Sequence, residues 1–157
     1  MKRLALASAF LGILSAAGPG WASSACTTTD DLDAVAKTRA LVKEKCDCAN
    51  AITDGLYKRC ALTVANDEIT ALRLPRECRK IVIKCAAKSI CGRPIGYHPC
   101  CRTNRLGKTR CKITIPEKCQ SGPGGSHCVS FDKESCCDAC KGNGVCSPSG
   151  AFVDVAQ

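Results

Sequence analysis

The alternation of apolar and polar positions predicts helices in the first half of the chain. After Asp30 and Asp31, apolar residues recur at intervals of three and four, as they do on one face of a helix. These residues are Leu32, Val35, Ala36 and Ala40. A second helix is predicted from about Asp54 toward Thr70. Its inward stripe would consist of Tyr57, Cys60, Ala61 and Val64, and would reach Leu72 if the helix continues.

A third predicted helix has the clearest boundaries. Pro75 suits the first helical position, Glu77 complements the positive end of the helix, and Gly92 suits a left-handed cap at the other end. One face of this helix gathers Cys78, Ile81, Val82, Cys85, Ala86 and Ser89. Because Cys78 and Cys85 both lie on that inner face, we expect each of them to bond to another segment.

The second half of the chain is predicted to form strands and turns. The stretch from Cys100 to Ile115 predicts a β-hairpin whose three-residue loop ends in Gly107, at the position that requires a positive φ. This register sets Thr103 opposite Thr109, a favourable pair, and Cys101 opposite Cys111. Two cysteines so placed can carry a disulfide, and we therefore predict a Cys101–Cys111 bond.

Residues 1–22 have the layout of a secretory signal peptide. Lys2 and Arg3 precede an apolar run from Leu4 to Ala17, which is too short to cross a bilayer. A Gly-Pro-Gly break and small residues follow, so we place cleavage after Ala22, with Ala25 as the alternative. Two other interpretations are a retained N-terminal anchor and a lipid on Cys26, although the residues before Cys26 lack the leucine of a bacterial lipobox. We expect a secreted protein, periplasmic or extracellular, with no transmembrane segment in the mature chain.

Cysteine is the dominant residue of the mature chain. Cleavage after Ala22 leaves 135 residues, which contain all sixteen cysteines and four aromatic residues. Such a cysteine content in a short secreted chain indicates a disulfide scaffold that compensates for a small apolar core. The even number allows eight bonds, but the spacing does not determine their pairing. The cysteines are Cys26, Cys46, Cys48, Cys60, Cys78, Cys85, Cys91, Cys100, Cys101, Cys111, Cys119, Cys128, Cys136, Cys137, Cys140 and Cys146.

These patterns together predict the fold class. We expect an α+β fold, a small disulfide-rich domain with three short helices followed by a β-hairpin and cystine-bound loops. Residues 23–147 would form this single domain, and residues 148–157 a disordered tail. Within the domain, residues 120–126 are predicted to be a flexible loop and residues 136–146 a set of turns.

Three stretches carry a family resemblance: GLYKRCALTVAND (55–67), CRKIVIKCAAKSICGRPIGYHPCCR (78–102) and SHCVSFDKESCCDAC (126–140). In this order they resemble a group of uncharacterised cysteine-rich secreted bacterial proteins. The resemblance covers roughly residues 46–146. It implies secretion and disulfide bonds, and it implies no activity or ligand.

Positive charge is concentrated in one window. The chain has a formal net charge of +9, and the segment from Cys78 to Pro116 contains ten Lys or Arg and no Asp or Glu. Four cations recur every fourth residue on the outer face of the third helix, and others follow in the hairpin. If the two surfaces adjoin, they form an anion-binding field. The candidate anion-binding residues are Arg76, Arg79, Lys80, Lys84, Lys88, Arg102, Arg105, Lys108, Arg110 and Lys112.

The cysteine spacing favours ordinary disulfides over a metal or redox site. Cys137 and Cys140 have the CxxC spacing of a zinc ligand pair, but no second CxxC or HxxxH pair exists. A thioredoxin-type CxxC belongs at a helix N-terminus in a βαβ unit, and no parallel-strand pattern surrounds this pair. We therefore expect structural bonds here, no metal and no cofactor.

A hydrolase is the enzymatic alternative. His98 precedes a Cys-Cys pair, and Ser126 and His127 adjoin a glycine-rich loop, which invites comparison with small secreted phospholipases. However, Pro99 follows His98, no carboxylate is near, and adjacent loop residues do not set a nucleophile against its base. We assign no catalytic residues, and a hydrolase would require a concave pocket in which His98 or His127 meets a carboxylate.

The expected function is therefore that of a non-catalytic secreted module, with a small hydrolase or a toxin-like effector as the alternative. Its expected partner is an acidic glycan or a phosphate-rich surface polymer. Recognition of nucleic acid would need aromatic side chains for stacking, and the basic window offers only Tyr97. Membrane disruption would need an apolar insertion face, and here that face is used by the core.

Overall fold

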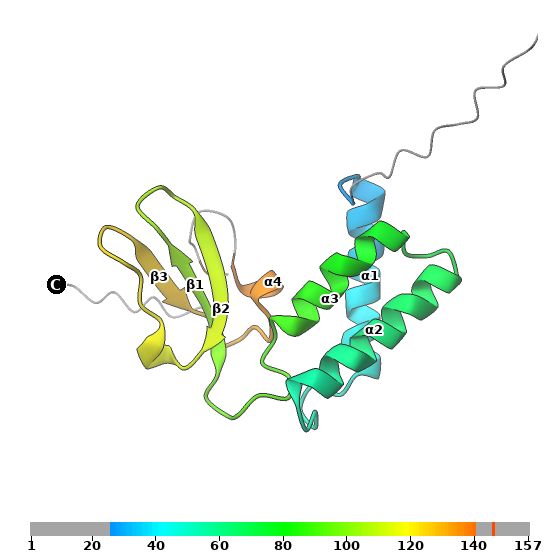
Figure 1. The fold of residues 1–157 in the computed structure, drawn as a ribbon, viewed down its shortest axis with the longest axis horizontal. Helices are drawn as coiled ribbons and strands as arrows, with labels where there is room; N and C mark the ends of the chain where they lie inside the picture. Colours follow the sequence, from blue (N-terminus) through cyan, green and yellow to red (C-terminus); the bar gives the residue numbers. More distant parts are fainter. Residues whose placement is uncertain (1–25, 141–145, 147–157) are drawn as a thin grey trace, which may run out of the picture.

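The computed structural model describes residues 26–140 and Cys146, which form a helical part and a sheet part (Figure 1). The helices α1 (Thr29–Lys45), α2 (Asp54–Thr70) and α3 (Arg79–Ala87) pack on one another. The strands β1 (His98–Thr103), β2 (Thr109–Thr114) and β3 (Ser126–Val129) form an antiparallel sheet in the order β2-β1-β3. Two 3-10 turns, η1 (Arg76–Cys78) and η2 (Pro116–Lys118), and the short helix α4 (Cys136–Ala139) complete the described elements. The fold is a small disulfide-rich α+β domain, as expected.

The predicted signal peptide and the predicted tail, residues 1–22 and 148–157, lie outside the described residues. Among the described helices, none combines the length and apolar character that crossing a bilayer requires.

The first helix forms as predicted, but its buried face differs. Thr28 and Asp31 make a capping box, in which the Asp31 N–H donates to the Thr28 hydroxyl at 3.1 Å and the Thr28 N–H donates to the Asp31 carboxylate at 3.2 Å. The buried residues are Val35, Thr38 and Val42, so the predicted stripe is wrong apart from Val35. Thr38 can be buried because its hydroxyl donates a hydrogen bond to the Ala34 carbonyl at 2.8 Å.

The second helix has the predicted limits, while the third ends early. α2 buries Tyr57, Ala61 and Val64, but Leu72 is 93% exposed because the chain leaves the helix at Ala71. α3 ends at Ala87, so the prediction that Gly92 caps it is wrong. Gly92 does have a positive φ of +71°, and a Cβ there would overlap the Thr53 backbone at the start of α2. Glycine is required at this position for close approach of two segments.

The predicted hairpin is confirmed in register and turn. Thr103 pairs with Thr109, and their hydroxyl oxygens lie 3.0 Å apart. The Asn104 N–H donates to the Lys108 carbonyl at 3.2 Å, which closes the three-residue loop, and Gly107 adopts a φ of +74°.

One strand was not predicted. Ser126–Val129, expected to continue from a flexible loop, forms β3 and pairs with β1. The loop before it approaches the sheet so closely that a Cβ on Gly125 would overlap the Thr103 carbonyl oxygen. The absence of a side chain at Gly125 thus lets this loop lie against the end of β1.

All sixteen cysteines are bonded, as predicted, in eight disulfides. The helical part contains Cys26–Cys78, Cys46–Cys60 and Cys48–Cys91. The sheet part contains Cys100–Cys119, Cys101–Cys140, Cys111–Cys136 and Cys128–Cys146. Cys85–Cys137 joins α3 to α4.

The predicted Cys101–Cys111 bond is wrong although the two residues are directly opposite in the hairpin. Both side chains leave the same face of the sheet, and this face is covered by residues 136–140, which comprise α4 and Cys140. Each sulfur bonds to that covering segment, Cys101 to Cys140 and Cys111 to Cys136. The bonds therefore attach the segment to the sheet.

The helical and sheet parts are connected through residues 134–138. Backbone N–H groups of Ile90 and Cys136 donate to the Glu134 and Lys88 carbonyls, both at 2.8 Å. On α4, the Asp138 carboxylate accepts a hydrogen bond from Arg39 of α1 at 2.6 Å. Covalent, backbone and ionic contacts thus hold α4 between the two parts.

Candidate anion-binding surface

Four cations line the outer face of α3 and the turn before it. We call Arg76, Lys80, Lys84 and Lys88 the α3 row; they lie opposite the buried Val82 and Cys85. Arg76, Lys80 and Lys84 are exposed, and Lys88 is half-buried. Arg79, beside the row, donates to the Asn66 side-chain oxygen at 3.2 Å. Steps of four residues separate neighbouring cations by about 6 Å along a helix axis.

The α3 row meets the sheet at Lys88. The Lys88 ammonium donates to the Cys111 carbonyl of β2 at 3.5 Å. Cys111 stands between Arg110 and Lys112, both of which are exposed. The last cation of the α3 row therefore lies beside β2, the strand that carries Arg110 and Lys112.

Side chains of β1 and β2 divide between the two faces of the sheet. Cys101 and Cys111 belong to the face that α4 and Cys140 cover. Arg102, Arg110 and Lys112 alternate with them and therefore lie on the opposite face. Arg105 and Lys108 are exposed in the turn between the strands. We call Arg102, Arg110 and Lys112 the sheet cations.

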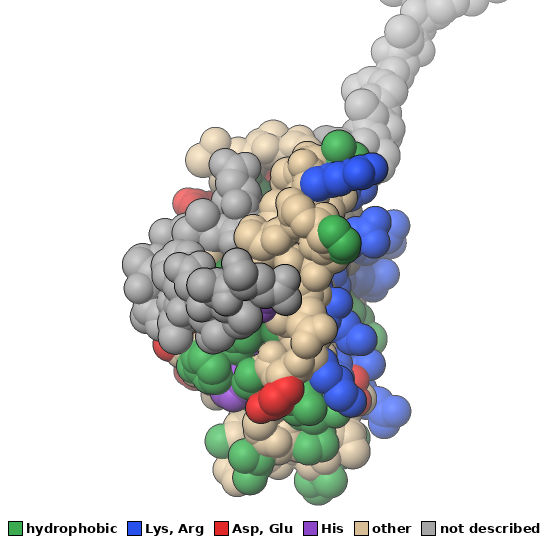
Figure 2. Space-filling model, turned by 90° about the vertical axis from the view of Figure 1, so that its left-hand side faces the viewer, with side chains coloured by type: hydrophobic (Ala, Val, Ile, Leu, Met, Phe, Trp, Pro, Cys, Tyr) green, Lys and Arg blue, Asp and Glu red, His purple; other side chains and the backbone are tan. Residues whose placement is uncertain are grey.

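The ten candidate cations have no acidic partner among the described residues. The salt bridges formed within 26–140 involve other cations, such as Arg39 and Lys43 with Asp138 and Arg73 with Glu68. In space-filling view, Lys and Arg side chains gather in a band along the right-hand edge, the side that faces the reader in Figure 1 (Figure 2). Few acidic side chains interrupt this band.

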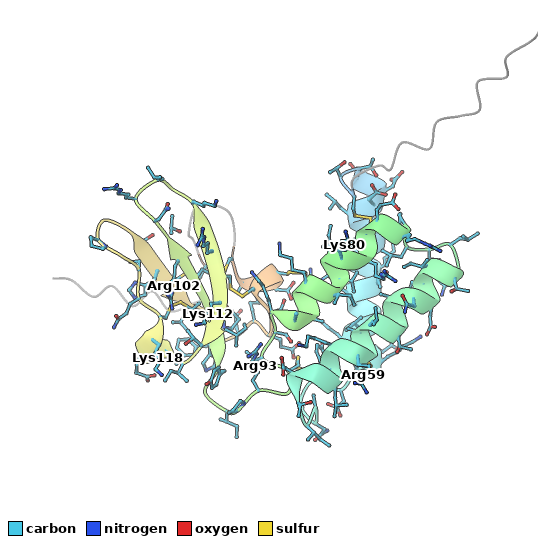
Figure 3. All side chains as sticks on the ribbon, in the orientation of Figure 1. Arg59, Lys80, Arg93, Arg102, Lys112 and Lys118 are labelled. Atoms are coloured by element: carbon cyan, nitrogen blue, oxygen red, sulfur yellow. A yellow bond between two sulfur atoms is a disulfide. The ribbon has the colours of Figure 1, made fainter. Side chains whose placement is uncertain are left out.

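The structure also adds residues that the sequence did not single out. These residues are Lys118, which lies near Arg102 and Lys112, and Arg93, which lies between the sheet and the helices (Figure 3). The Arg93 side chain donates a hydrogen bond to the Ser89 carbonyl at 3.0 Å and forms a salt bridge with Asp54 at 3.7 Å. The exposed Lys118 contributes its backbone carbonyl to Arg102 at 2.8 Å. Neither role is visible in the sequence, because both depend on contacts between distant segments.

The two histidines occupy separate environments. The His98 ring contacts Phe131 with 4.7 Å between ring centroids, and its Nδ1 is buried without a hydrogen-bond partner among the described residues. His127 Nδ1 lies 3.5 Å from the Ser121 hydroxyl oxygen. Within the described ranges, neither ring is hydrogen-bonded to a carboxylate, so these residues do not form the cluster that a hydrolase would require.

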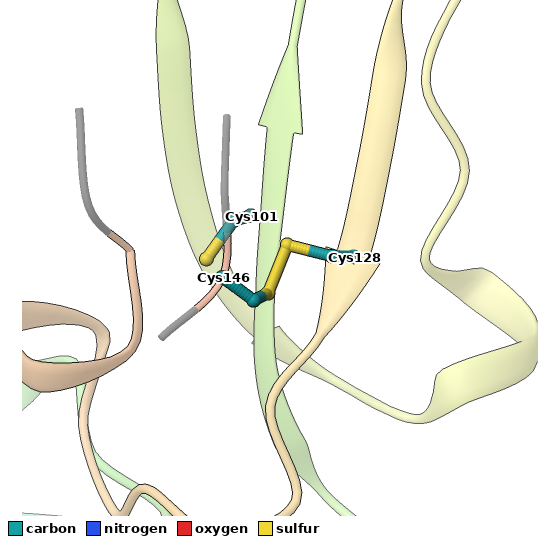
Figure 4. A group of neighbouring side chains, drawn as sticks. All are labelled: Cys101, Cys128 and Cys146. Atoms are coloured by element: carbon teal, nitrogen blue, oxygen red, sulfur yellow. A yellow bond between two sulfur atoms is a disulfide. The ribbon is translucent and has the colours of Figure 1, made fainter. Parts of the chain in front are cut away.

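Sulfur atoms gather beneath the sheet. The Sγ atoms of Cys101, Cys128 and Cys146 lie within 4.8 Å of one another (Figure 4). However, Cys128 is bonded to Cys146, and Cys101 to Cys140. A cysteine binds a metal as a thiolate, and each of these sulfur atoms is bonded in a disulfide instead. The cluster results from two disulfides that pack against each other.

Comparison with protein-family models, with curated proteins and with solved structures finds no match to this chain. The resemblance to cysteine-rich secreted bacterial proteins stays a prediction.

Proposed function

We propose that this protein is a secreted, non-catalytic module that binds an anionic polymer through the α3 row and the sheet cations. The observation that carries the proposal is the contact of Lys88 with the Cys111 carbonyl, which makes the two groups of cations adjacent. The partner is an acidic glycan or a phosphate-rich surface polymer. Secretion is supported by the signal-peptide pattern of residues 1–22 and by the eight disulfides, which persist in oxidising compartments.

The physical basis is electrostatic. Unpaired cations on one side of a protein create a positive potential that attracts a polyanion and accelerates its association. Binding releases the small ions condensed on the polymer, so affinity falls steeply as salt rises. The disulfides make the backbone rigid, so the cations can be held close together although they form no ion pairs with described acidic residues.

The test is binding of fluorescently labelled polyphosphate and polygalacturonate, followed by anisotropy between about 50 and 200 mM salt. We expect saturable binding of at least one polymer at low salt and a steep loss of affinity as salt rises. Lys84→Glu should weaken binding about tenfold, or 1.4 kcal/mol. Lys37→Glu is the matched control, because it changes the net charge equally at an exposed position on α1, which lies behind α2 and α3 in Figure 1.

Lys37→Glu should change the affinity less than about twofold, since the Debye length at 0.1 M salt is about 10 Å. Equal losses in the two variants would mean that net charge acts without a defined surface. Absence of binding to both polymers at low salt would remove the proposal.

A further inference from the structure

Arg102 lies in the central strand, between a cation and an imidazole on the neighbouring strands. In the register of the sheet, Arg110 of β2 and His127 of β3 are both directly opposite Arg102. Side chains of directly opposed residues leave the same face of a sheet, about 5 Å apart. Arg110, Arg102 and His127 thus form a row across all three strands.

The Arg102 guanidinium is held in place by the protein. Its Nη2 donates to the Lys118 carbonyl at 2.8 Å, and its Nε contacts the Cys100 sulfur at 3.4 Å. The Nη1 group makes no hydrogen bond to the described residues and remains free to donate. A half-buried guanidinium fixed in this way loses little further side-chain entropy when it binds a ligand.

Other cations surround this fixed guanidinium. Cys100 of β1 is directly opposite Lys112 of β2 in the sheet. The contact of the Arg102 Nε with the Cys100 sulfur therefore brings the guanidinium toward Lys112. Figure 3 shows Arg102, Lys112 and Lys118 together at the sheet. Like charges directly opposed in a sheet are unfavourable. An anion at this place would offset the repulsion between Arg102 and Arg110, which no described carboxylate does.

On the basis of the proposed function, we infer that Arg102, Arg110 and Lys112 form a binding site for one tetrahedral oxyanion group of the polymer, a phosphate or sulfate ester. We call this site the seat. A tetrahedral group presents several oxygens in different directions, so Arg102, Arg110 and Lys112 can each donate to a different oxygen. A carboxylate offers two coplanar oxygens and satisfies fewer of these donors. In this arrangement the α3 row attracts the polymer electrostatically, and the seat at Arg102 favours a polymer that carries phosphate or sulfate esters.

The experiment titrates the ¹⁵N-labelled oxidised protein with sulfate, inorganic phosphate and malonate at neutral pH and constant ionic strength. Sulfate and malonate are dianions, so they separate oxyanion geometry from charge. We expect saturable binding of sulfate or phosphate, tighter than that of malonate, with the largest amide shifts in residues 100–103 and 110–112. Whichever of sulfate and phosphate binds more tightly identifies the ester.

Variants locate the seat. Arg102→Gln should weaken sulfate or phosphate binding about tenfold or more, and Arg102→Lys should lie between it and the native protein. Arg105→Gln is the matched control, since it removes the same charge from the exposed turn of the same hairpin. Arg110→Gln is a second variant that removes no hydrogen bond within the described residues, and it should weaken binding several-fold.

Equal effects of Arg102→Gln and Arg105→Gln, or malonate binding as tight as that of sulfate and phosphate, would overturn the seat. The proposed function would survive that result if the labelled polymers still bound in a salt-dependent way. If the polymers do not bind at low salt, the proposed function itself is wrong.

Discussion

Leu72 is a non-glycine residue with a positive φ, +58°, and it follows the C-cap of α2. The chain closes the helix there through hydrogen bonds from the Arg73 and Leu74 N–H groups to the Glu68 carbonyl at 2.9 and 3.1 Å. A left-handed conformation is costly for a residue with a Cβ, and glycine is the usual residue at this place. The leucine side chain is 93% exposed, so its removal sacrifices little packing.

We therefore expect Leu72→Gly to stabilise the protein by about 0.5–1 kcal/mol, after the greater freedom of glycine in the unfolded chain is subtracted. The measurement is the midpoint of guanidinium unfolding with the disulfides intact. Leu106→Gly is the control, because Leu106 is 82% exposed in the hairpin turn and its φ is not positive. It should give no gain, and the same response in both variants would show that the backbone at Leu72 is unstrained.

Individual residues also show which sequence inferences hold. Gly107 was placed correctly because a three-residue hairpin loop requires a positive φ at a known position. Gly92 was assigned to a helix cap, but its conformation serves the contact with Thr53, thirty-nine positions earlier. Leu72 was expected on the inner stripe only if the second helix continued, and apolar periodicity does not indicate where a helix stops. Local rules succeed where the deciding contact is local.

The same distinction applies to elements. The hairpin was predictable because its turn and its threonine pair lie in one short stretch. β3 has only four residues, follows a glycine-rich loop, and exists because it pairs with β1. The ten candidate cations were identifiable from the four-residue spacing on the third predicted helix and from the window without Asp or Glu. The contact of Lys88 with β2 and that of Arg102 with the Lys118 carbonyl bring together segments that are distant in the sequence.

α4 is a four-residue helix whose position depends on contacts with other elements. Burial opposes ionisation of Asp138, but hydrogen bonds from Arg39 at 2.6 Å and Ser135 at 2.8 Å outweigh this effect and lower the pKa of the Asp138 carboxyl. A carboxyl whose pKa is lower in the folded protein stabilises it above the unfolded pKa of about 3.9. That stability is lost as pH falls through the lower, folded pKa.

Asp138→Asn should therefore reduce the free energy of unfolding at pH 7 by roughly 1–2 kcal/mol. The difference from the native protein should shrink below about pH 4 and disappear below both pKa values. Guanidinium unfolding at several pH values measures it. Asp33→Asn, at an exposed position of α1 with no salt bridge to a described residue, should change stability little at any pH. A pH-independent loss in Asp138→Asn would mean that the ionised carboxylate is not what holds α4.

The molecule divides its apolar residues among separate clusters. A cluster of mostly small side chains lies between α1, α2 and α3, while the sheet part has two small clusters made largely of cysteine. Clusters of this size bury little apolar surface, so covalent bonds must supply much of the stability. We expect the protein to keep its structure on heating while oxidised and to lose it when the disulfides are reduced.

The pairing of Cys26 with Cys78 connects this stability to the processing of the chain. Cys26 is the first described residue, and its sulfur is bonded to Cys78, the last residue of η1, directly before α3. A lipid on that sulfur would exclude the disulfide and leave Cys78 as a thiol. Cleavage after Ala22 without lipid would instead keep Cys26 available for its bond.

The intact mass of the protein expressed from the full-length chain, alkylated before and after reduction, distinguishes these cases. Eight disulfides predict no label before reduction and sixteen labels afterwards, on a chain that begins at Ser23. Loss of the far-ultraviolet helical signal should accompany reduction, because Cys26–Cys78, Cys46–Cys60 and Cys48–Cys91 close the helical part. One label before reduction, together with an added acyl mass and only fifteen labels afterwards, would identify a lipoprotein and contradict the Cys26–Cys78 bond.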